Sequence, residues 1–202
     1  MPFEQIKSIV EALLFASDAP LTPDRLKSIL PDAGIPAIRQ ATDALNEEYE
    51  RTGRAFRIVA LAGGFQIAAL PQYADWIRQL HPDRAPGKLS PSALETLAII
   101  AFKQPVIRPE IEAIRGVNSD WVLRTLMERS LIKIVGRSSA PGRPLLYGTT
   151  KEFLRYFGLN SVSDLPRPEE LKVLLSGKEN VAEREAQSLS GPVGERVASE
   201  SG

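Results

Sequence analysis

The stretch Phe56-Arg-Ile-Val-Ala-Leu-Ala-Gly-Gly-Phe-Gln-Ile-Ala-Ala69 decides how the first half of this chain is interpreted. It contains two short runs, at 56–60 and 65–69, whose β-branched and aromatic residues favour extended backbone. Gly63 and Gly64 lie between the runs, and glycine accepts the positive φ angles that a tight turn requires. The stretch therefore predicts a β-hairpin with a turn at the glycine pair.

Three helical segments are predicted before this hairpin. Residues 4–17 carry apolar side chains at helical spacing, namely Ile6, Ile9, Val10, Leu13 and Leu14. Thr22 followed by Pro23 is typical of an N-cap with proline in the first turn, and this second helix extends to about residue 30. A third helix at 36–51 is expected to bury Ile38, Ala41, Leu45 and Tyr49. Three helices followed by a hairpin is the order of a winged-helix domain.

The same order occurs again after residue 88. Helices are predicted at 90–104 and 108–115, and a third follows the N-cap Asn118-Ser119 and extends to residue 129. Strands are expected at 131–136 and 145–149, around a turn-rich loop. Ala16-x-x-x-Pro20-Leu21 also matches Ala101-x-x-x-Pro105-Val106 at an offset of 85 residues. We therefore expect an α+β, mainly helical chain of two tandem winged-helix domains, each with three helices and a β-hairpin wing.

Composition places the domain boundaries. We expect an N-terminal domain at 1–80 and a C-terminal domain at 89–166. The linker at 81–88 is polar and contains two prolines and a glycine. The tail at 167–202 is rich in Ser, Glu and Gly beyond about residue 175, so we expect it to be largely disordered.

The residues for enzyme chemistry are missing from this sequence. It has no cysteine and a single histidine, His81, which precedes a proline in the predicted linker. Nucleophilic catalysis by a Cys-His pair is therefore excluded, and catalysis by a Ser-His pair would have to use His81. Glu47, Glu48 and Glu50 diverge in direction around their helix, which favours a solvated face over a metal site. The sequence predicts no enzyme, no catalytic residue, no metal and no cofactor.

The sequence also shows no sign of a membrane or secretory segment. The longest apolar run, at 97–102, is far shorter than the ~20 residues that cross a bilayer. The first residues lack the basic-then-apolar order of a signal peptide. A cytoplasmic location is the resulting expectation.

The net charge of zero hides a difference between the two halves. Residues 1–80 contain eight Lys/Arg and ten Asp/Glu, whereas residues 88–157 contain eleven and six. A basic second domain could bind nucleic acid or an acidic protein, or it could have an ordinary solvated surface. A DNA-binding transcriptional regulator is therefore the alternative interpretation.

The outward faces of the two third helices argue for protein contact rather than DNA contact. In the first half, the outward residues are Arg39, Asp43, Glu47 and Glu50, and three acids would repel phosphate. In the second half, Val122, Leu123 and Leu126 are predicted to point inward. The outward residues there are Asp120, Trp121, Arg124 and Glu128. A tryptophan among mixed charges is typical of a protein-binding face, although Trp121 could instead pack on the wing or the linker.

Two further sets of residues are candidate contacts. In helix 90–104 the apolar stripe is predicted as Leu94, Leu97, Ala98 and Ala101, with Ile100 at its boundary. Ile99 falls on the far side, so we select Ile99, Trp121 and Arg124 as candidate partner-binding residues. Arg137 and Arg143 in the wing loop could contact nucleic acid. The glycines and prolines of that loop favour a loop folded onto its own domain instead.

Several motifs of the second half resemble one known family. They are Leu94-Glu-Thr-Leu-Ala-Ile-Ile-Ala-Phe-Lys-Gln-Pro105, Glu112-Ala-Ile-Arg-Gly-Val-Asn-Ser119, Pro141-Gly-Arg-Pro-Leu-Leu-Tyr-Gly-Thr-Thr150 and Phe153-Leu-Arg-Tyr-Phe-Gly158. In this order they resemble bacterial segregation and condensation protein B, together with Glu11-Ala-Leu-Leu-Phe-Ala-Ser17 in the first half.

The resemblance implies two winged-helix domains and a homodimer formed mainly by the N-terminal domains. It also implies binding to the kleisin, segregation and condensation protein A, and through it to an SMC ATPase. The implied role is non-enzymatic support of chromosome condensation and segregation during cell division. Direct DNA binding would be weak or absent.

Overall fold

The computed structural model describes residues 1–80 and 89–166. Backbone contacts group Met1–Val162 into one compact unit. The predicted linker at 81–88 and the predicted tail at 167–202 lie outside the described residues. The domain boundaries proposed above therefore stay predictions, whereas a mixed, mainly helical architecture is confirmed.

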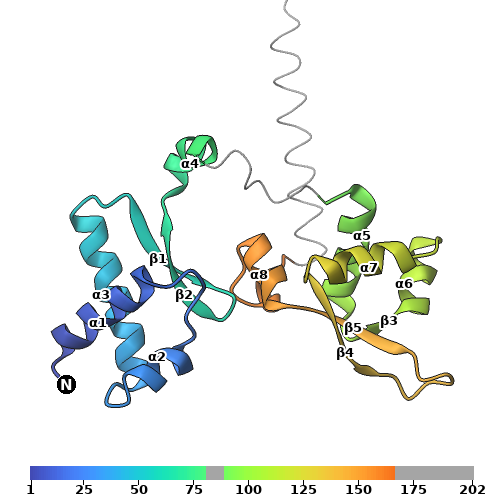
Figure 1. Cartoon of the computed structure of the whole chain (residues 1–202), viewed down its shortest axis with the longest axis horizontal. Helices are drawn as coiled ribbons and strands as arrows, with labels where there is room; N and C mark the ends of the chain where they lie inside the picture. The colour runs from blue at the N-terminus through green and yellow to red at the C-terminus, as the bar shows by residue number, and fades with distance from the viewer. Residues whose placement is uncertain (81–88, 167–202) are drawn as a thin grey trace, which may run out of the picture. The chain divides into compact units, whose positions relative to one another are not determined.

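The first half contains the three predicted helices and the predicted hairpin (Figure 1). The elements are α1 (Phe3–Phe15), α2 (Pro23–Ile29), α3 (Ile35–Arg51), β1 (Phe56–Leu61) and β2 (Gly64–Ala69). The N-cap of α2 is confirmed, because the Thr22 hydroxyl accepts the Arg25 N–H at 3.2 Å and Pro23 follows it.

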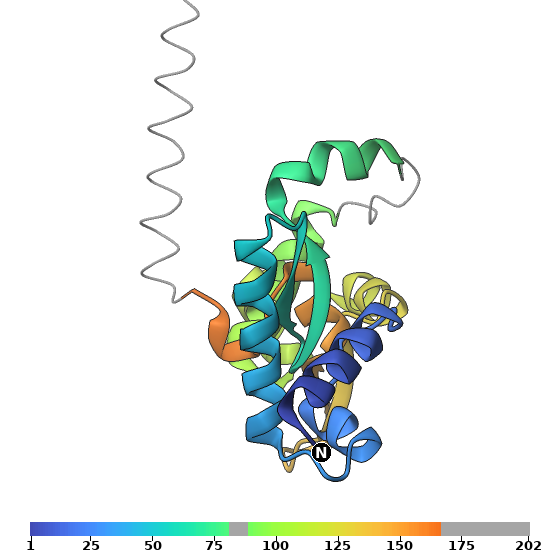
Figure 2. The same ribbon diagram turned by 90° about the vertical axis from the view of Figure 1, so that its left-hand side faces the viewer.

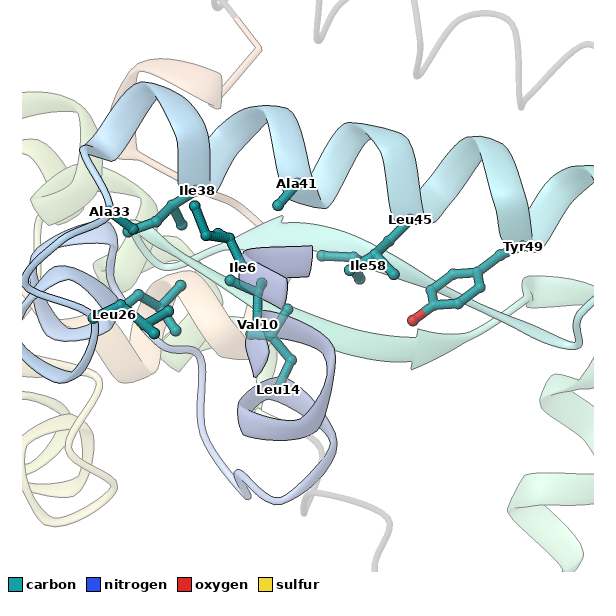
Figure 3. Close-up of a cluster of buried hydrophobic side chains, with 11 residues drawn as sticks. Ile6, Val10, Leu14, Leu26, Ala33, Ile38, Ala41, Leu45, Tyr49 and Ile58 are labelled. Atoms are coloured by element: carbon teal, nitrogen blue, oxygen red, sulfur yellow. The ribbon is translucent and has the colours of Figure 1, made fainter. Parts of the chain in front are cut away.

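The core of this half lies between α1, α3 and the hairpin, as Figures 2 and 3 show. Every fourth residue of α1 is buried, and the predicted face of α3 is buried together with Thr42. The cluster consists of Ile6, Val10, Leu14, Leu26, Leu30, Ala33, Ile38, Ala41, Leu45, Tyr49 and Ile58. Ile9 and Leu13, also predicted as part of the stripe, pack at its edge.

The hairpin turn lies one residue earlier than the glycine pair suggested. Leu61 pairs with Gly64, so the turn residues are Ala62 and Gly63, with φ angles of 52° and 78°. Gly64 belongs to the strand, where a Cβ would lie 2.7 Å from the Leu21 carbonyl oxygen. Leu21 and Phe65 exchange two backbone hydrogen bonds of 2.9 Å there, which is why the chain approaches so closely.

The second half repeats this order with one additional short strand. Its elements are α5 (Pro91–Lys103), β3 (Val106–Ile107), α6 (Arg108–Arg115), α7 (Asp120–Glu128), β4 (Ile132–Arg137) and β5 (Leu145–Thr149). The sheet has the order β3-β5-β4, so the hairpin prediction missed its third strand. Leu21 and Phe65 form the equivalent contact in the first half, as an isolated bridge. Leu21 and Val106, which match in the internal repeat, thus each pair with the second strand of the hairpin in their own half.

Short helices outside the repeat were not predicted. They are η1 (Pro71–Tyr73), α4 (Ala74–Leu80), α8 (Lys151–Phe157) and η3 (Val162–Asp164). The Thr150 hydroxyl caps α8 by accepting the Phe153 N–H at 3.1 Å. Among the described helices, none has the length and apolar character needed to span a membrane.

Candidate partner-binding surface

The buried face of α5 differs from the predicted one. The buried residues are Ala93, Thr96, Leu97, Ile100 and Ala101, whereas Leu94 and Ala98 of the predicted stripe are exposed. Ile100, predicted at the boundary, is completely buried. The physical reason is Thr96, whose hydroxyl donates to the Ser92 carbonyl at 2.9 Å and can therefore enter the core. The prediction placed Thr96 at the surface, so the predicted apolar stripe was turned away from the face of α5 that is actually buried.

This rotation changes which apolar residues of α5 are available to a partner. Ile99 is only partly exposed, while Leu94 and Phe102 are each 43% exposed. Ile114 at the end of α6 and Val117 after it are also exposed. None of these four residues was among the predicted contact residues. Counting Thr96 with the apolar positions would have identified Leu94 and Phe102.

Trp121 lies on the outward face of α7 and is 71% exposed. The alternative of a tryptophan packed on the wing therefore does not hold, and the predicted linker lies outside the described residues. Arg124, one helical turn further, is exposed as well, and Val122, Leu123 and Leu126 are buried as predicted. A large apolar side chain beside a cation on a rigid helix is the arrangement typical of an interface anchor.

A buried arginine connects the helices that carry these residues. The Arg115 side chain is only 6% exposed. Its guanidinium donates to Ser92 Oγ at 2.7 Å, to Glu95 Oε2 at 3.2 Å and to Ser119 Oγ at 3.3 Å. Because these partners lie on α5 and just before α7, one side chain positions three helices.

The start of α7 is held by a second group of polar contacts. Arg108 forms ion pairs with Asp120 and, at 3.4 Å, with Glu112. Glu112 in turn accepts the Ser119 N–H at 3.0 Å. Asn118 Oδ1 accepts the Asp120 N–H at 3.0 Å, while the Ser119 side chain makes no capping bond. These contacts fix the orientation of the helix that presents Trp121.

The wing loop between β4 and β5 is folded onto itself. Arg137 Nη1 donates to the Arg143 carbonyl at 3.3 Å, and the Ser138 N–H donates to the Pro144 carbonyl at 2.8 Å. Arg143 has a φ of 46°, within a turn closed by its N–H to Ala140. Both arginine side chains remain exposed. These contacts all lie within the loop, so the expectation of a loop folded onto its own domain stays a prediction.

The wing also exposes apolar side chains. The register shifts between Ile134 and Gly136, so Ile134 and Val135 both face solvent on the edge strand β4. A shallow hollow of about 420 Å³ lies beside them, lined by Gln104, Pro105, Val135, Leu146 and Gly148. Gln104 Oε1 already accepts from the N–H and the hydroxyl of Thr149, at 2.7 and 3.1 Å. The hollow thus offers mainly apolar contact.

The outward face of α3 is acidic, as predicted. Arg39, Asp43, Glu47 and Glu50 are all exposed. The Arg39 guanidinium lies 5.8 Å from the centre of the Phe65 ring. The one cation of this face therefore makes a cation–π contact with the hairpin. In the described part of the chain, no group of three His, Cys, Asp or Glu residues could hold a metal ion.

The family model described as segregation and condensation complex subunit ScpB matches residues 8–168. The chain belongs to this family. A relative from Syntrophotalea carbinolica, segregation and condensation protein B, is 45% identical over 177 residues, which are 88% of this chain and 89% of the relative. The protein of the same name from Geobacillus thermodenitrificans is 48% identical over 161 residues, 79% of this chain and 77% of the relative.

Two solved structures are also similar in sequence to this chain. ScpB from Mycobacterium tuberculosis is 31% identical, with 79% of this chain and 98% of that chain covered and a TM-score of 0.37. A dimer of a ScpB N-terminal domain in complex with a ScpA peptide is 28% identical, with 39% and 96% covered and a TM-score of 0.35. Because both TM-scores are below 0.5, family membership rests on the sequence matches.

Proposed function

We propose that this chain is a non-catalytic subunit of a bacterial SMC complex. In this proposal it acts in the cytoplasm at the nucleoid, as a homodimer of tandem winged-helix domains. It binds the kleisin, segregation and condensation protein A, and supports chromosome condensation and segregation. The observation that carries the proposal is the family match over residues 8–168. The ScpA peptide bound to a related N-terminal domain is the precedent for the partner.

The exposed face of α7 supports a protein partner for the second half. Trp121 and Arg124 project from a helix whose orientation is fixed by the contacts of Arg108 and Arg115. A pre-oriented aromatic side chain loses little conformational freedom on binding, so most of its contact energy becomes affinity. Leu94 and Phe102 on α5 add apolar surface and join Ile99 as candidate contacts.

The test is a calorimetric titration of the full chain with the middle segment of the kleisin. Trp121→Ala is expected to weaken binding at least ~10-fold, the equivalent of ~1.4 kcal/mol. Ile134→Ala is the matched control, since this apolar side chain is also exposed but lies on the wing strand β4, away from α5 and α7. It should leave kleisin affinity unchanged. Equal affinities for Trp121→Ala and wild type would remove the α7 face from the proposal.

DNA binding is the alternative function, favoured by the basic surplus of residues 88–157 and the exposed Arg137 and Arg143. A phosphate-driven complex must weaken steeply with salt. Electrophoretic mobility of duplex DNA over a salt series decides between the two functions. Tight binding at physiological salt that is lost in Arg137→Ala and Arg143→Ala would favour the DNA-binding regulator.

A further inference from the structure

The apolar side of α4 lacks cover within the described residues. The helix Ala74–Leu80 contains no buried residue. Tyr73, Trp76, Ile77 and Leu80 have the spacing of one helical face, and Trp76 and Leu80 are 67% and 72% exposed. Asp75 and Arg78 lie on the opposite face and pair with each other at 2.9 Å. An amphipathic helix of two turns is marginal alone in water, so this face is suited to packing against another surface.

The same half of the chain contains an uncovered apolar hollow. It measures about 230 Å³ and is lined by Ser8, Glu11, Ala12, Phe15, Tyr49, Phe56 and Ile67. Phe15, at the end of α1, is 83% exposed, and the Tyr49 and Phe56 rings stack edge to face at 5.0 Å. Small-molecule pockets usually exceed ~300 Å³, so a hollow of this size fits single side chains of a protein better.

The polar groups of the helix and the hollow are complementary. Glu11 Oε1 accepts the Tyr49 hydroxyl at 2.7 Å, which leaves the other carboxylate oxygen available at the hollow. The Trp76 indole N–H is a donor that requires an acceptor when it is buried. A tryptophan placed in this hollow would therefore satisfy its one polar atom.

The helix does not cover the hollow of its own chain. No α4 residue lines it. The turn into α4 is held by the Leu70 N–H, which donates to the Ala55 carbonyl at 2.9 Å, and by the Tyr73 N–H, which donates to the Leu70 carbonyl at 3.0 Å. Figure 2 shows α4 beyond the end of the hairpin. The helix and the hollow are thus two separate, unpaired surfaces on one half of the chain.

We propose that α4 of one copy packs into the Phe15 hollow of a second copy, and that the second copy returns the same contact. This inference rests on the proposed homodimer and names its interface. A reciprocal contact closes a two-fold dimer, because each chain contributes one helix and one hollow. A buried aromatic side chain removes ~150–250 Å² of accessible surface, so Trp76 and Phe15 of each copy would contribute roughly 300–500 Å² of the ~800 Å² per partner that a standard interface buries.

The absence of cysteine from the chain allows a direct test. Two differently tagged full-length variants, Phe15→Cys and Leu80→Cys, are mixed, re-equilibrated and treated with a short bismaleimide. The expected product is a crosslinked pair that carries both tags. A Leu80→Cys variant that crosslinks only with itself would overturn the inference, because the two helices would then pair with each other.

Sedimentation of the full chain gives the second readout. Trp76→Asp and Phe15→Asp should each raise the dimer dissociation constant at least ~100-fold, because a charge would enter an apolar contact. Trp121→Asp is the matched control at an equally exposed tryptophan and should leave the dimer intact. A dimer with wild-type affinity in both test variants would overturn this inference alone. A monomeric wild-type chain would overturn the proposed homodimer as well.

Discussion

At the scale of single residues, Gly64 shows how a missing side chain permits a tertiary contact. A Cβ at this position would lie 2.7 Å from the Leu21 oxygen and 2.8 Å from its carbonyl carbon, and backbone atoms cannot move aside easily. We predict that Gly64→Ala lowers the free energy of unfolding by about 2 kcal/mol. Urea denaturation followed by circular dichroism measures this change.

Gly136→Ala is the matched control for that substitution. Gly136 also lies in a strand, but the nearest atom to an added Cβ is Leu146 Cδ1, at 3.9 Å. The added methyl group should change the stability by less than ~1 kcal/mol, and could raise it by restricting the unfolded chain. Equal losses in the two variants would contradict the proposed steric cause.

Tyr49 should make the stability of the first half fall as the pH rises above about 10. Burial, and then the hydrogen bond to Glu11, raise the pKa of Tyr49 above its ordinary value near 10. Since the folded state favours the neutral phenol, this contribution is present below pH ~10 and is lost as the pH rises through the folded-state pKa. Tyr49→Phe should lower the free energy of unfolding by about 1–2 kcal/mol at pH 7.

The difference between wild type and Tyr49→Phe should shrink above pH ~10. Denaturation curves from pH 7 to pH 12 provide the measurement. Tyr156→Phe is the control, because in the described residues Tyr156 makes a ring contact with Phe157 and its hydroxyl makes no hydrogen bond. A stability difference for Tyr49→Phe that stays constant across this range would contradict the prediction.

At the scale of elements, the packing of α5, α6 and α7 depends on Arg115. Removing a buried guanidinium leaves Ser92 and Ser119 without their donor, whereas the more exposed Glu95 can be solvated by water. We therefore predict that Arg115→Ala costs about 2 kcal/mol of stability, less than for a fully buried pair. Arg115→Lys should not restore it, because one ammonium lacks the fork geometry of the guanidinium.

Arg155→Ala is the control for this element. Its 3.2 Å pair with Glu152 has the same length as the pair of Arg115 with Glu95, but both side chains are at least 40% exposed. An exposed pair of this kind contributes at most ~0.5 kcal/mol. Thermal unfolding of both variants distinguishes a positioning role from a simple surface ion pair. Similar melting temperatures would contradict the role of Arg115.

At the scale of the whole molecule, the two halves share an element order but differ in surface. The first half is acidic along α3 and carries the apolar face of α4, whereas the second half is basic and exposes Trp121. One repeated architecture can therefore present different partner surfaces, since surface residues are free to vary when the core pattern is kept.

The C-terminal segment allows a prediction for the whole chain from composition alone. Residues 176–202 contain few large apolar side chains, so they cannot offset the entropy cost of ordering. Ending the chain after Leu175 should leave the melting temperature nearly unchanged in differential scanning calorimetry. A drop of several degrees would show that this segment packs on the rest of the protein.

The sequence by itself determined the features that depend on local chemistry. The spacing of apolar residues predicted α1, α3 and α7, and Thr22 with Pro23 predicted the start of α2. Periodicity and capping involve neighbours within one or two turns, so they can be recognised without knowing the rest of the chain. The motifs from Leu94 to Gly158 likewise indicated the family that the comparisons confirm.

Only the tertiary structure decided which faces were buried and which were left open. The buried side of α5 depends on Thr96, whose hydroxyl is satisfied within its own helix. The turn lies at Ala62-Gly63 and not at the predicted Gly63-Gly64, because Gly64 belongs to the strand that Leu21, distant in sequence, approaches. These features depend on contacts between distant segments, and side-chain periodicity contains no information about such contacts.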